Sequence, residues 1–366
     1  MPAEYQVRIY GSNGTLRAVV TDELMLAYTR RRNEPGSGAV LLSGEHRAIA
    51  ELERRGQIEI WRRNADYGID WYCDFYGLFG GYRYTQDARK RCLVKVVGQM
   101  AMLGWRIVAW KSETLSRSKF VAAKAETIMK TLVSYNAGAN ATTGNGRLRA
   151  GTWGDRTINI QADGAGGNTR DWYCASDNLL ATLQDLARVA GGDFDLVKTA
   201  ATTWEFRWYA GQLGTDRSST VTLSVDRGNM ASADYDYDLT SEKTVAIVGG
   251  QGEASDRNFV VRTGTDYNAS TNDIEVFVDA RRYSTTAGLE AAGDVAMGKS
   301  RAAASFDYKV VQVPSSLYGL HYFLGDKVKA VTPLGGSVTQ LVNGVSVTFQ
   351  PSGENPESID PEMINA

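Results

Sequence analysis

The first residues alternate between apolar and polar positions in short runs that predict β-strands. Residues 5–10 and 15–20 follow a period of two, and the glycine-containing cluster at 11–14 predicts a turn between them. Another run covers 24–32, and a short apolar strand is expected at 39–42 after a Pro-Gly-Ser turn. The opening segment therefore predicts a series of connected strands.

One short helix is expected among these strands. Residues 46–55 form a helical stretch, and Gly56 ends it in the manner of a C-cap. Alternation resumes over 57–62. The pattern predicts a small β-barrel wrapped around one helix, without an obvious pocket or nucleophile.

The middle of the chain predicts two longer helices and a hairpin. Residues 119–135 gather apolar side chains near one side of a helix and lysines away from it. A second helix is expected over 178–190, where Gly191 and Gly192 stop it. Residues 193–197 and 204–209 alternate and predict a β-hairpin.

The last third of the chain predicts a return to strands. Alternation resumes at Val221 and continues to closing strands over 327–331 and 346–349, with a helical insert around 284–306. The segment after Pro351 is polar and acidic, which predicts a flexible tail.

The order of these segments resembles the tail-hub (baseplate hub) proteins of long-tailed bacteriophages. A basic strand ends in Arg32-Asn33 and is followed by a Pro-Gly-Ser turn, an apolar strand, a short helix, a glycine and a strand with Glu and Arg. Corresponding segments follow in order at 99–108, 125–136, 274–281 and 322–329. These motifs are structural rather than chemical, and together they span nearly the whole chain.

The resemblance implies a β-rich α+β fold with two related β-barrel modules that superpose. The expected domains are a first hub barrel with a short helix at 1–115, an α+β module at 116–210, a second hub barrel with a helical insert around 284–306 at 211–350, and a flexible C-terminal tail at 351–366.

The resemblance also implies a structural role rather than catalysis. The chain would be the baseplate or tail-tip hub of a long non-contractile siphovirus tail, a virion protein assembled in the host cytoplasm. A homotrimer would present six barrels in a quasi-sixfold ring. This ring would join the tail tube and the distal tail protein to tip or fibre proteins, and it would also meet the C-terminus of the tape-measure protein. No cofactor is implied.

Charge and cysteine content limit the kinds of ligand and partner that the chain is expected to bind. With 40 basic and 42 acidic residues, the net charge of -2 gives no overall attraction to nucleic acid or anionic membranes. The densest basic run, at 87–91, is interpreted as a solvated turn. No long apolar run predicts a membrane span, and no sequence-specific nucleic-acid binding is expected. Cys73, Cys92 and Cys174 lack metal-site spacing, and their odd number favours reduced, buried thiols.

Two sequence motifs match the patterns of ligand-binding loops wholly or in part. Residues 293–300 fit the phosphate-loop pattern GxxxxGK[ST], but helix-forming residues precede them where that loop needs a strand. A structural helix is therefore expected there. Asp234-Tyr-Asp-Tyr-Asp238 has the start of a calcium loop but lacks the required glycine and final glutamate, so an alternating strand is expected instead.

Few residues are candidates for catalysis or for carbohydrate binding. His46 and His321 are the only histidines, and no nucleophile elbow or HExxH motif accompanies them. No catalytic, cofactor-binding or metal-binding residue is therefore assigned. The alternatives are a tail-associated cell-wall hydrolase with a glycosidase-type carboxylate pair, for which the sequence favours no particular pair, and a carbohydrate-binding β-module. Trp71, Tyr72, Trp204 and Trp208 could serve the latter, although their strand-like context favours core packing.

Overall fold

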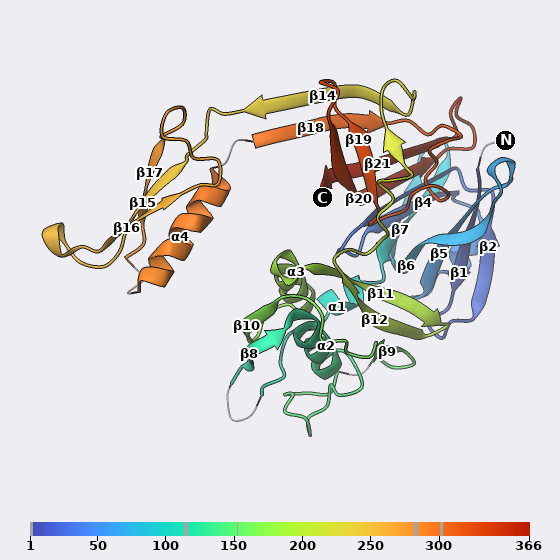
Figure 1. The fold of residues 1–366 in the computed structure, drawn as a ribbon. Coiled ribbons are helices and arrows are strands. Elements are labelled where there is room, and N and C mark those ends of the chain that lie inside the picture. Colours follow the sequence, from blue (N-terminus) through green and yellow to red (C-terminus); the bar gives the residue numbers. More distant parts are fainter. Residues whose placement is uncertain (1–2, 113–115, 152, 282–284, 301–302) are drawn as a thin grey trace. The chain divides into compact units, whose positions relative to one another are not determined.

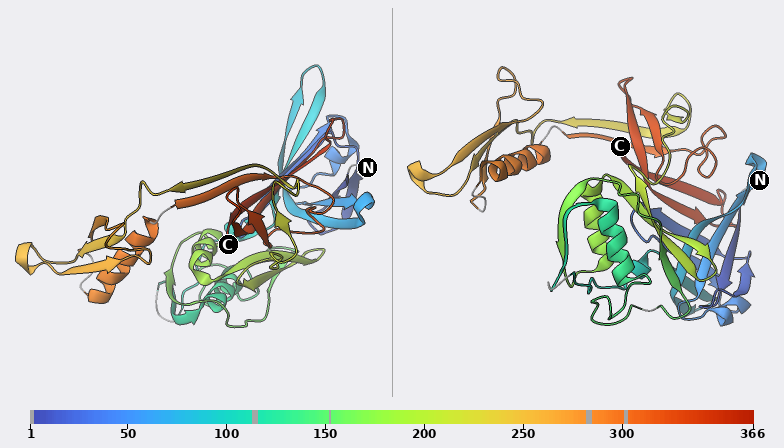
Figure 2. Two further views of the ribbon diagram at one scale, coloured as in Figure 1. Left: turned by 45° about the horizontal axis from the view of Figure 1, so that its top comes forward. Right: turned by 60° about the horizontal axis from the view of Figure 1, so that its bottom comes forward.

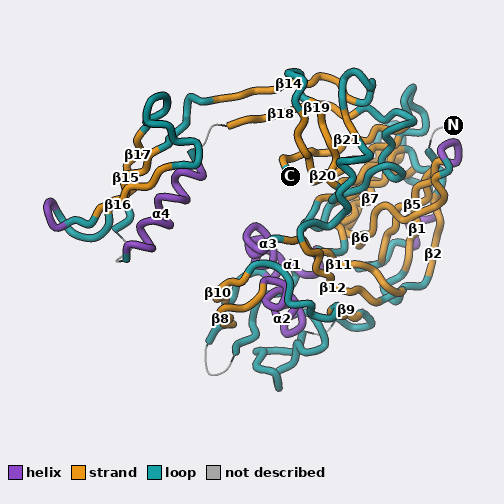
Figure 3. Tube along the Cα trace, viewed as in Figure 1, coloured by secondary structure: helices purple, strands orange, loops and turns teal. Residues whose placement is uncertain are grey.

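The computed structural model describes residues 3–112, 116–151, 153–281, 285–300 and 303–366. Strands far outnumber helices, so the predicted β-rich α+β class is confirmed (Figure 1, Figure 3). The chain divides into two compact units. Unit 1 comprises Met1–Asn229, Val310–Val331 and Ser337–Ala366, and unit 2 comprises Met230–Lys309 and Thr332–Gly336.

An eleven-stranded sheet forms the largest part of unit 1 (Figure 2). Its strand order is β13-β19-β20-β3-β4-β7-β6-β5-β1-β2, and β21 pairs with β20 outside this path. The strands are β1 (Glu4–Tyr10), β2 (Leu16–Val20), β3 (Met25–Arg31), β4 (Ser37–Ser43), β5 (Gln57–Asn64), β6 (Ile69–Gln86), β7 (Lys90–Gly98), β13 (Thr222–Leu223), β19 (Lys327–Val331), β20 (Ser337–Phe349) and β21 (Glu357–Asn365).

The strand predictions of the opening segment are confirmed, and the helix among them is shorter than expected. In β1, Tyr5, Val7 and Ile9 are buried at every second position, as alternation requires. The helical stretch expected over 46–55 is a 3-10 helix, η1 (Arg47–Glu51). A second short 3-10 helix, η2 (Ala65–Tyr67), connects β5 to β6.

The prediction of two β-barrels is wrong. No sheet closes within the described part of the chain, because β2 pairs only with β1, and β13 only with β19. The strands expected to form a second barrel over 211–350 are divided between sheets. β19 and β20 continue the sheet of the N-terminal strands, for example through the pairing of Val347 with Tyr28. Alternation predicts a strand but carries no information about its partner.

The C-terminal tail is also more ordered than predicted. Within the expected flexible tail at 351–366, residues Glu357–Asn365 form β21, which pairs antiparallel with β20. Ile359 lies opposite Val347 and is buried, and Pro361 is buried two positions later. The apolar residues at alternate positions anchor this otherwise acidic segment to the sheet.

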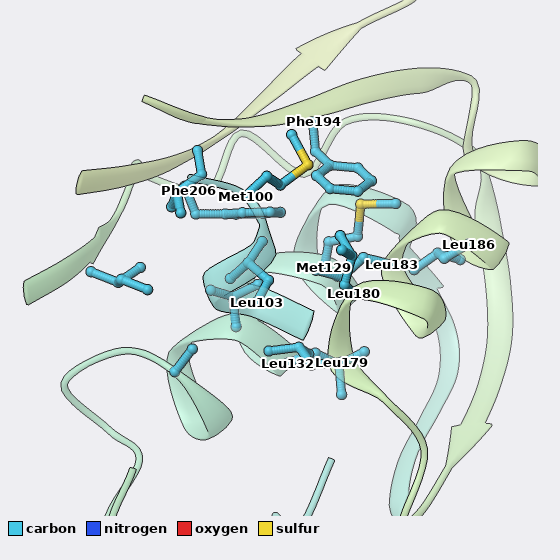
Figure 4. Close-up of a cluster of buried hydrophobic side chains, with 14 of the residues drawn as sticks. Met100, Leu103, Met129, Leu132, Leu179, Leu180, Leu183, Leu186, Phe194 and Phe206 are labelled. Atoms are coloured by element: carbon cyan, nitrogen blue, oxygen red, sulfur yellow. The ribbon is translucent and has the colours of Figure 1, made fainter. Parts of the chain in front are cut away.

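An α+β region between the strands β7 and β13 completes unit 1. Helices α2 and α3 pack together with the sheet of β11, β12 and β9 around Met129, Leu132, Leu183 and Phe194 (Figure 4). The elements are α1 (Ala101–Gly104), β8 (Ser118–Lys124), α2 (Ala125–Asn136), β9 (Thr157–Ile160), β10 (Thr169–Cys174), α3 (Leu179–Ala190), β11 (Gly192–Ala200) and β12 (Thr203–Ala210).

Most predictions for this region are confirmed. The helix expected at 178–190 is α3, capped by the Asn178 side chain, and the expected hairpin is β11–β12. The helix expected over 119–135 is wrong for its first part, since β8 pairs there with β10. The limits of the predicted module at 116–210 stay a prediction. Unit 1 contains this range together with the large sheet, and residue 115 lies outside the described part of the chain.

Unit 2 contains a small three-stranded sheet and one helix. Helix α4 covers the sheet of β16, β15 and β17 through Leu289 and Met297, which contact Ala246 and Val248. The helical insert predicted around 284–306 is shorter, since a strand begins at Ala303; residues 284 and 301–302 lie outside the described part. The elements are β14 (Met230–Asp238), β15 (Val245–Gly249), η3 (Ala254–Asp256), β16 (Phe259–Thr263), β17 (Glu275–Asp279), α4 (Thr286–Lys299) and β18 (Ala303–Val310), the last paired with β14.

Candidate functional site

The phosphate-loop pattern at 293–300 lies in α4, as the helix prediction required. Both glycines of the pattern belong to the helix, which begins after its cap Thr285. The backbone N–H groups at Gly293 therefore lie in the middle of a helix rather than in a loop between a strand and a helix. Asp294 binds the Arg262 guanidinium through both oxygens, at 2.8 and 3.2 Å, which ties this turn of α4 to β16.

The Asp234–Asp238 motif forms the end of β14, so the predicted alternating strand is confirmed. A strand spreads alternate carboxylates along one face and does not wrap them around an ion. Among the described residues, no group of three His, Cys, Asp or Glu side chains is placed to hold a metal ion.

Both histidines have structural contacts. The Nδ1 atom of His46 accepts a hydrogen bond from the Ala48 amide at the start of η1, and its Nε2 atom lies 3.0 Å from Asp22. The Nδ1 atom of His321 accepts a hydrogen bond from the Leu317 amide. These contacts leave each ring fixed in a turn or cap of the main chain.

The three cysteines are free thiols, as predicted. Cys92 and Cys174 are buried and Cys73 is half-buried. Burial, together with the charge of Asp177, raises the pKa of Cys174 to about 12. A thiol with so high a pKa is a poor nucleophile at neutral pH.

The aromatic residues considered for carbohydrate binding separate into two groups. Trp204 and Trp208 are buried, which confirms core packing for both. Trp71 is half-buried under the guanidinium of Arg63, 4.8 Å from the ring centre, and the Tyr72 hydroxyl accepts from Arg62. The four side chains therefore do not form one exposed aromatic platform.

A buried polar network in unit 1 was not predicted from the sequence. Asp74 on β6 accepts hydrogen bonds from Tyr28 at 2.5 Å, from Tyr318 at 2.9 Å and from Arg30 at 2.9 Å. Burial, followed by the Asp74 charge, raises the pKa of both tyrosine hydroxyls, so they remain donors. The network fastens the segment around Tyr318 to β3 and β6 and acts as a structural joint.

The hairpin of β6 and β7 forms an exposed arm, residues 82–91, that projects from the sheet (Figure 2). β6 leaves its partner β5 after Leu78, and a β-bulge at Phe79–Gly81 precedes the arm. Tyr82 and Tyr84 are 54% and 43% exposed. The basic run at 87–91 is the turn of this arm, as predicted, and an Arg91–Asp87 ion pair stabilises it.

No helix in the described part of the chain combines the length and apolar character that a membrane crossing demands. Within the described residues, the candidates above do not come together in one site. The most distinctive exposed feature of unit 1 is the arm of β6 and β7, where the edge of β6 and two exposed tyrosines could meet another protein.

The chain matches one family model and is similar in fold to several solved structures. The family model described as Siphovirus ReqiPepy6 Gp37-like protein matches residues 6–359. No curated protein matches the chain. The structure is similar to the 43 kDa tail protein of prophage MuSo2 from Shewanella oneidensis, with a TM-score of 0.58 and 11% identity over 98% of each chain.

Two further solved structures are similar over almost their whole length. A tail protein from Neisseria meningitidis MC58 gives a TM-score of 0.55 and 11% identity, over 99% of this chain and 96% of the other. Prophage tail protein gp18 from Listeria monocytogenes EGD-e gives 0.54 and 10%, over 97% and 94%. At these identities the likeness establishes a shared fold.

Proposed function

The chain belongs to the Siphovirus ReqiPepy6 Gp37-like protein family, and from this premise we propose that it is a structural subunit of a siphophage tail. The observation that carries the proposal is the end-to-end similarity to the tail protein of prophage MuSo2, which covers 98% of both chains. The similarity extends over almost the whole of both chains and not merely over one module. The three similar structures of nearly complete coverage are all tail proteins, and this supports a structural role in the tail.

Within the tail, we propose the position of baseplate or tail-tip hub. A homotrimeric ring would join the tail tube and the distal tail protein to tip or fibre proteins, and would contact the tape-measure protein C-terminus. Closed rings of identical subunits are common among oligomers. The subunit would be assembled in the host cytoplasm and would remain in the virion without catalytic activity.

The exposed arm supports an assembly role. Beyond the bulge, β6 pairs only with β7 among the described strands, and the other edge of β7 is paired with β4 as far as Arg91. Tyr82 and Tyr84 on β6 leave large ring surfaces in solvent. From the bulge on, β6 is an edge strand whose outer N–H and C=O groups are free to meet another chain. Contact with a neighbouring subunit would bury these rings.

The copy number in assembled tails tests the hub proposal. Isolated tails should contain three copies of this chain at the distal end, measured by quantitative mass spectrometry and by averaged images along the tail axis. Six copies, or a position along the tube, would reject the hub. Release of soluble fragments from purified cell wall by the protein would reject the non-enzymatic role.

The arm provides a second test with a matched control. Tyr82→Ser with Tyr84→Ser should reduce incorporation into tails, whereas Tyr67→Ser, which removes another exposed tyrosine outside the arm, should not. Unfolding curves for the soluble variants would separate loss of folding from loss of assembly. Full incorporation of the folded arm variant would show that the arm is not an assembly contact.

A further inference from the structure

Six arginines from separate stretches of the chain gather on unit 1, and we call them the arginine surface. Arg106 lies at its centre, close enough to Arg55, Arg147 and Arg149 for their charges to act on it. Arg156 donates a hydrogen bond to the main-chain carbonyl of Arg55. The members are Arg54, Arg55, Arg106, Arg147, Arg149 and Arg156.

The positive charges of this surface are poorly compensated. Among the described residues, Arg55, Arg147, Arg149 and Arg156 form no ion pair with a carboxylate. The charges of two carboxylates, Glu53 and Asp155, reach Arg156 without an ion pair to it in the described part of the chain. Glu53 is itself paired with Arg17 at 3.0 Å and accepts from Ser12. Clustered cations of this kind are stabilised when an anion approaches.

Burial makes the lack of a counter-charge more costly. Arg147 and Arg156 are only 8% and 7% exposed, and the Nε atom of Arg147 has no hydrogen-bond partner in the described part of the chain. Burial, followed by the charges of Arg147, Arg149 and Arg55, lowers the pKa of Arg106 to about 10. The fold therefore maintains charges that repel one another.

Aromatic rings hold several of these guanidinium groups in place. The Arg106 guanidinium lies 3.6 Å from the centre of the Trp153 ring, and that of Arg55 lies 5.9 Å from the centre of Trp105. Trp105 and Trp153 are themselves in contact, with ring centres 6.4 Å apart. Stacking on a shared pair of rings fixes the cations, so a ligand would meet an ordered array.

The arginine surface is bordered by exposed apolar side chains. Trp105 and Ile107 are 45% and 46% exposed, and Leu148, directly before Arg149, is 84% exposed. A groove of about 570 Å³ adjoins Trp105, Arg54 and Arg55. Phe79, Val97 and two glycines of the β6 bulge, Gly80 and Gly81, line its remaining wall.

We propose that the arginine surface and its groove bind an acidic polypeptide segment of a partner protein, with apolar side chains between the carboxylates. The carboxylates would pair with the exposed guanidinium groups of Arg55 and Arg149. The apolar side chains would cover Leu148 and enter the groove beside Trp105. This partner site goes beyond the proposed hub function and requires no particular copy number.

The apolar border favours a polypeptide over nucleic acid. Single-stranded nucleic acid binds through aromatic platforms on which bases stack. Trp105 offers one exposed ring, which the Arg55 guanidinium already approaches. Leu148 and Ile107 offer no ring and gain by burial against other apolar side chains. Arginine and tryptophan together with apolar residues are also the composition of protein–protein contact sites.

Fluorescence anisotropy with the full chain tests the proposal. The first probe is a labelled peptide of alternating glutamate and leucine, and the second alternates glutamate with serine. The third is labelled single-stranded oligothymidine. We expect the glutamate–leucine peptide to bind tightest, and Arg149→Glu or Leu148→Ser to weaken it about tenfold.

The control variant is Arg227→Glu, which reverses an exposed arginine outside this surface and should leave binding unchanged. Both probed positions are exposed, and thermal unfolding would establish that each variant is folded. Equal affinity for the glutamate–serine peptide would reduce the site to unspecific charge attraction and overturn the proposal. Tighter binding of oligothymidine, lost in Arg149→Glu, would overturn it in favour of nucleic acid, and unchanged binding by both variants would place the ligand elsewhere.

Discussion

Arg62 and Glu357 form a bidentate ion pair that joins strands almost three hundred positions apart in the sequence. The Nε and Nη2 atoms of Arg62 lie 2.8 and 3.0 Å from the two carboxylate oxygens of Glu357. The Tyr5 hydroxyl also donates to this carboxylate. The pair fixes β21 against β5 and β1, so the C-terminal strand depends on a contact with the N-terminal sheet.

Removing Glu357 should therefore destabilise unit 1. We expect Glu357→Ala to lower the free energy of unfolding by about 3 kcal/mol, because Arg62 would be left buried without its partner. The exposed Arg63–Glu4 pair on the neighbouring residue is the control, and Glu4→Ala should cost below about 1 kcal/mol. Urea unfolding followed by tryptophan fluorescence measures both. Equal losses would contradict a special role for the buried pair.

The Glu126–Lys130 pair in α2 predicts a loss of stability in acid. Burial alone would raise the pKa of Glu126, but hydrogen bonds from Lys130 and from the amides of Gly164 and Gly166 outweigh it and lower the pKa. The folded protein therefore releases this proton more readily than the unfolded chain. Its contribution is present above the unfolded pKa, about 4.3, and is lost as the pH falls towards the folded pKa.

The variant Glu126→Gln should reveal directly that the charged Glu126 stabilises the protein at neutral pH but not in acid. Its unfolding free energy should be lower than that of the unaltered protein at pH 7, and the difference should shrink in acid. Asp185→Asn, which removes the exposed partner of Arg188, should change little at either pH. A difference for Glu126→Gln that grows in acid would show that the sign is wrong.

Glu23 predicts the opposite pH dependence. It is buried, its Oε2 atom has no hydrogen-bond partner in the described part, and burial is the first cause that raises its pKa. The folded state keeps this proton longer than the unfolded chain, so stability falls as the pH rises from the unfolded towards the folded pKa. Glu23→Gln should therefore increase stability at pH 7 by about 1 kcal/mol. A matched Glu45→Gln change at an exposed position should have little effect, and a destabilised Glu23→Gln would indicate an undetected cation at this carboxylate.

Local sequence patterns predicted much of the secondary structure of unit 1. Strand alternation and the glycine stop at 191 placed β1, α3 and the β11–β12 hairpin. The stretch at 119–124 was misassigned, since Phe120 and Ala123 are three residues apart and satisfy a helical period. In the fold, Phe120 lies opposite Trp172 of β10 and Ala123 lies opposite Arg170. A pairing partner fifty residues away decided between helix and strand.

The tertiary arrangement could not be read from such patterns. Asp74 meets Tyr28 and Tyr318, which are 46 and 244 positions away, and no local spacing marks them as partners. The arginine surface has the same origin, because its members come from scattered positions in a chain of net charge -2. The prediction of closed barrels was wrong for a related reason. Closure of a barrel depends on which edge strands pair, whereas alternation describes only one strand at a time.

The last prediction concerns the phosphate-loop pattern in α4. A phosphate loop needs free backbone N–H groups at the start of a helix, but Gly293 and Gly298 lie within α4, and Asp294 is bound to Arg262. A carboxylate at that position would also repel a phosphate. Lys299→Ala should therefore leave the melting temperature with and without Mg-ATP unchanged, as should the control Lys309→Ala in β18. A micromolar affinity for Mg-ATP in the unaltered protein, abolished by Lys299→Ala and retained in Lys309→Ala, would show that α4 opens into a binding loop and that the helical assignment does not describe the ligand-bound state.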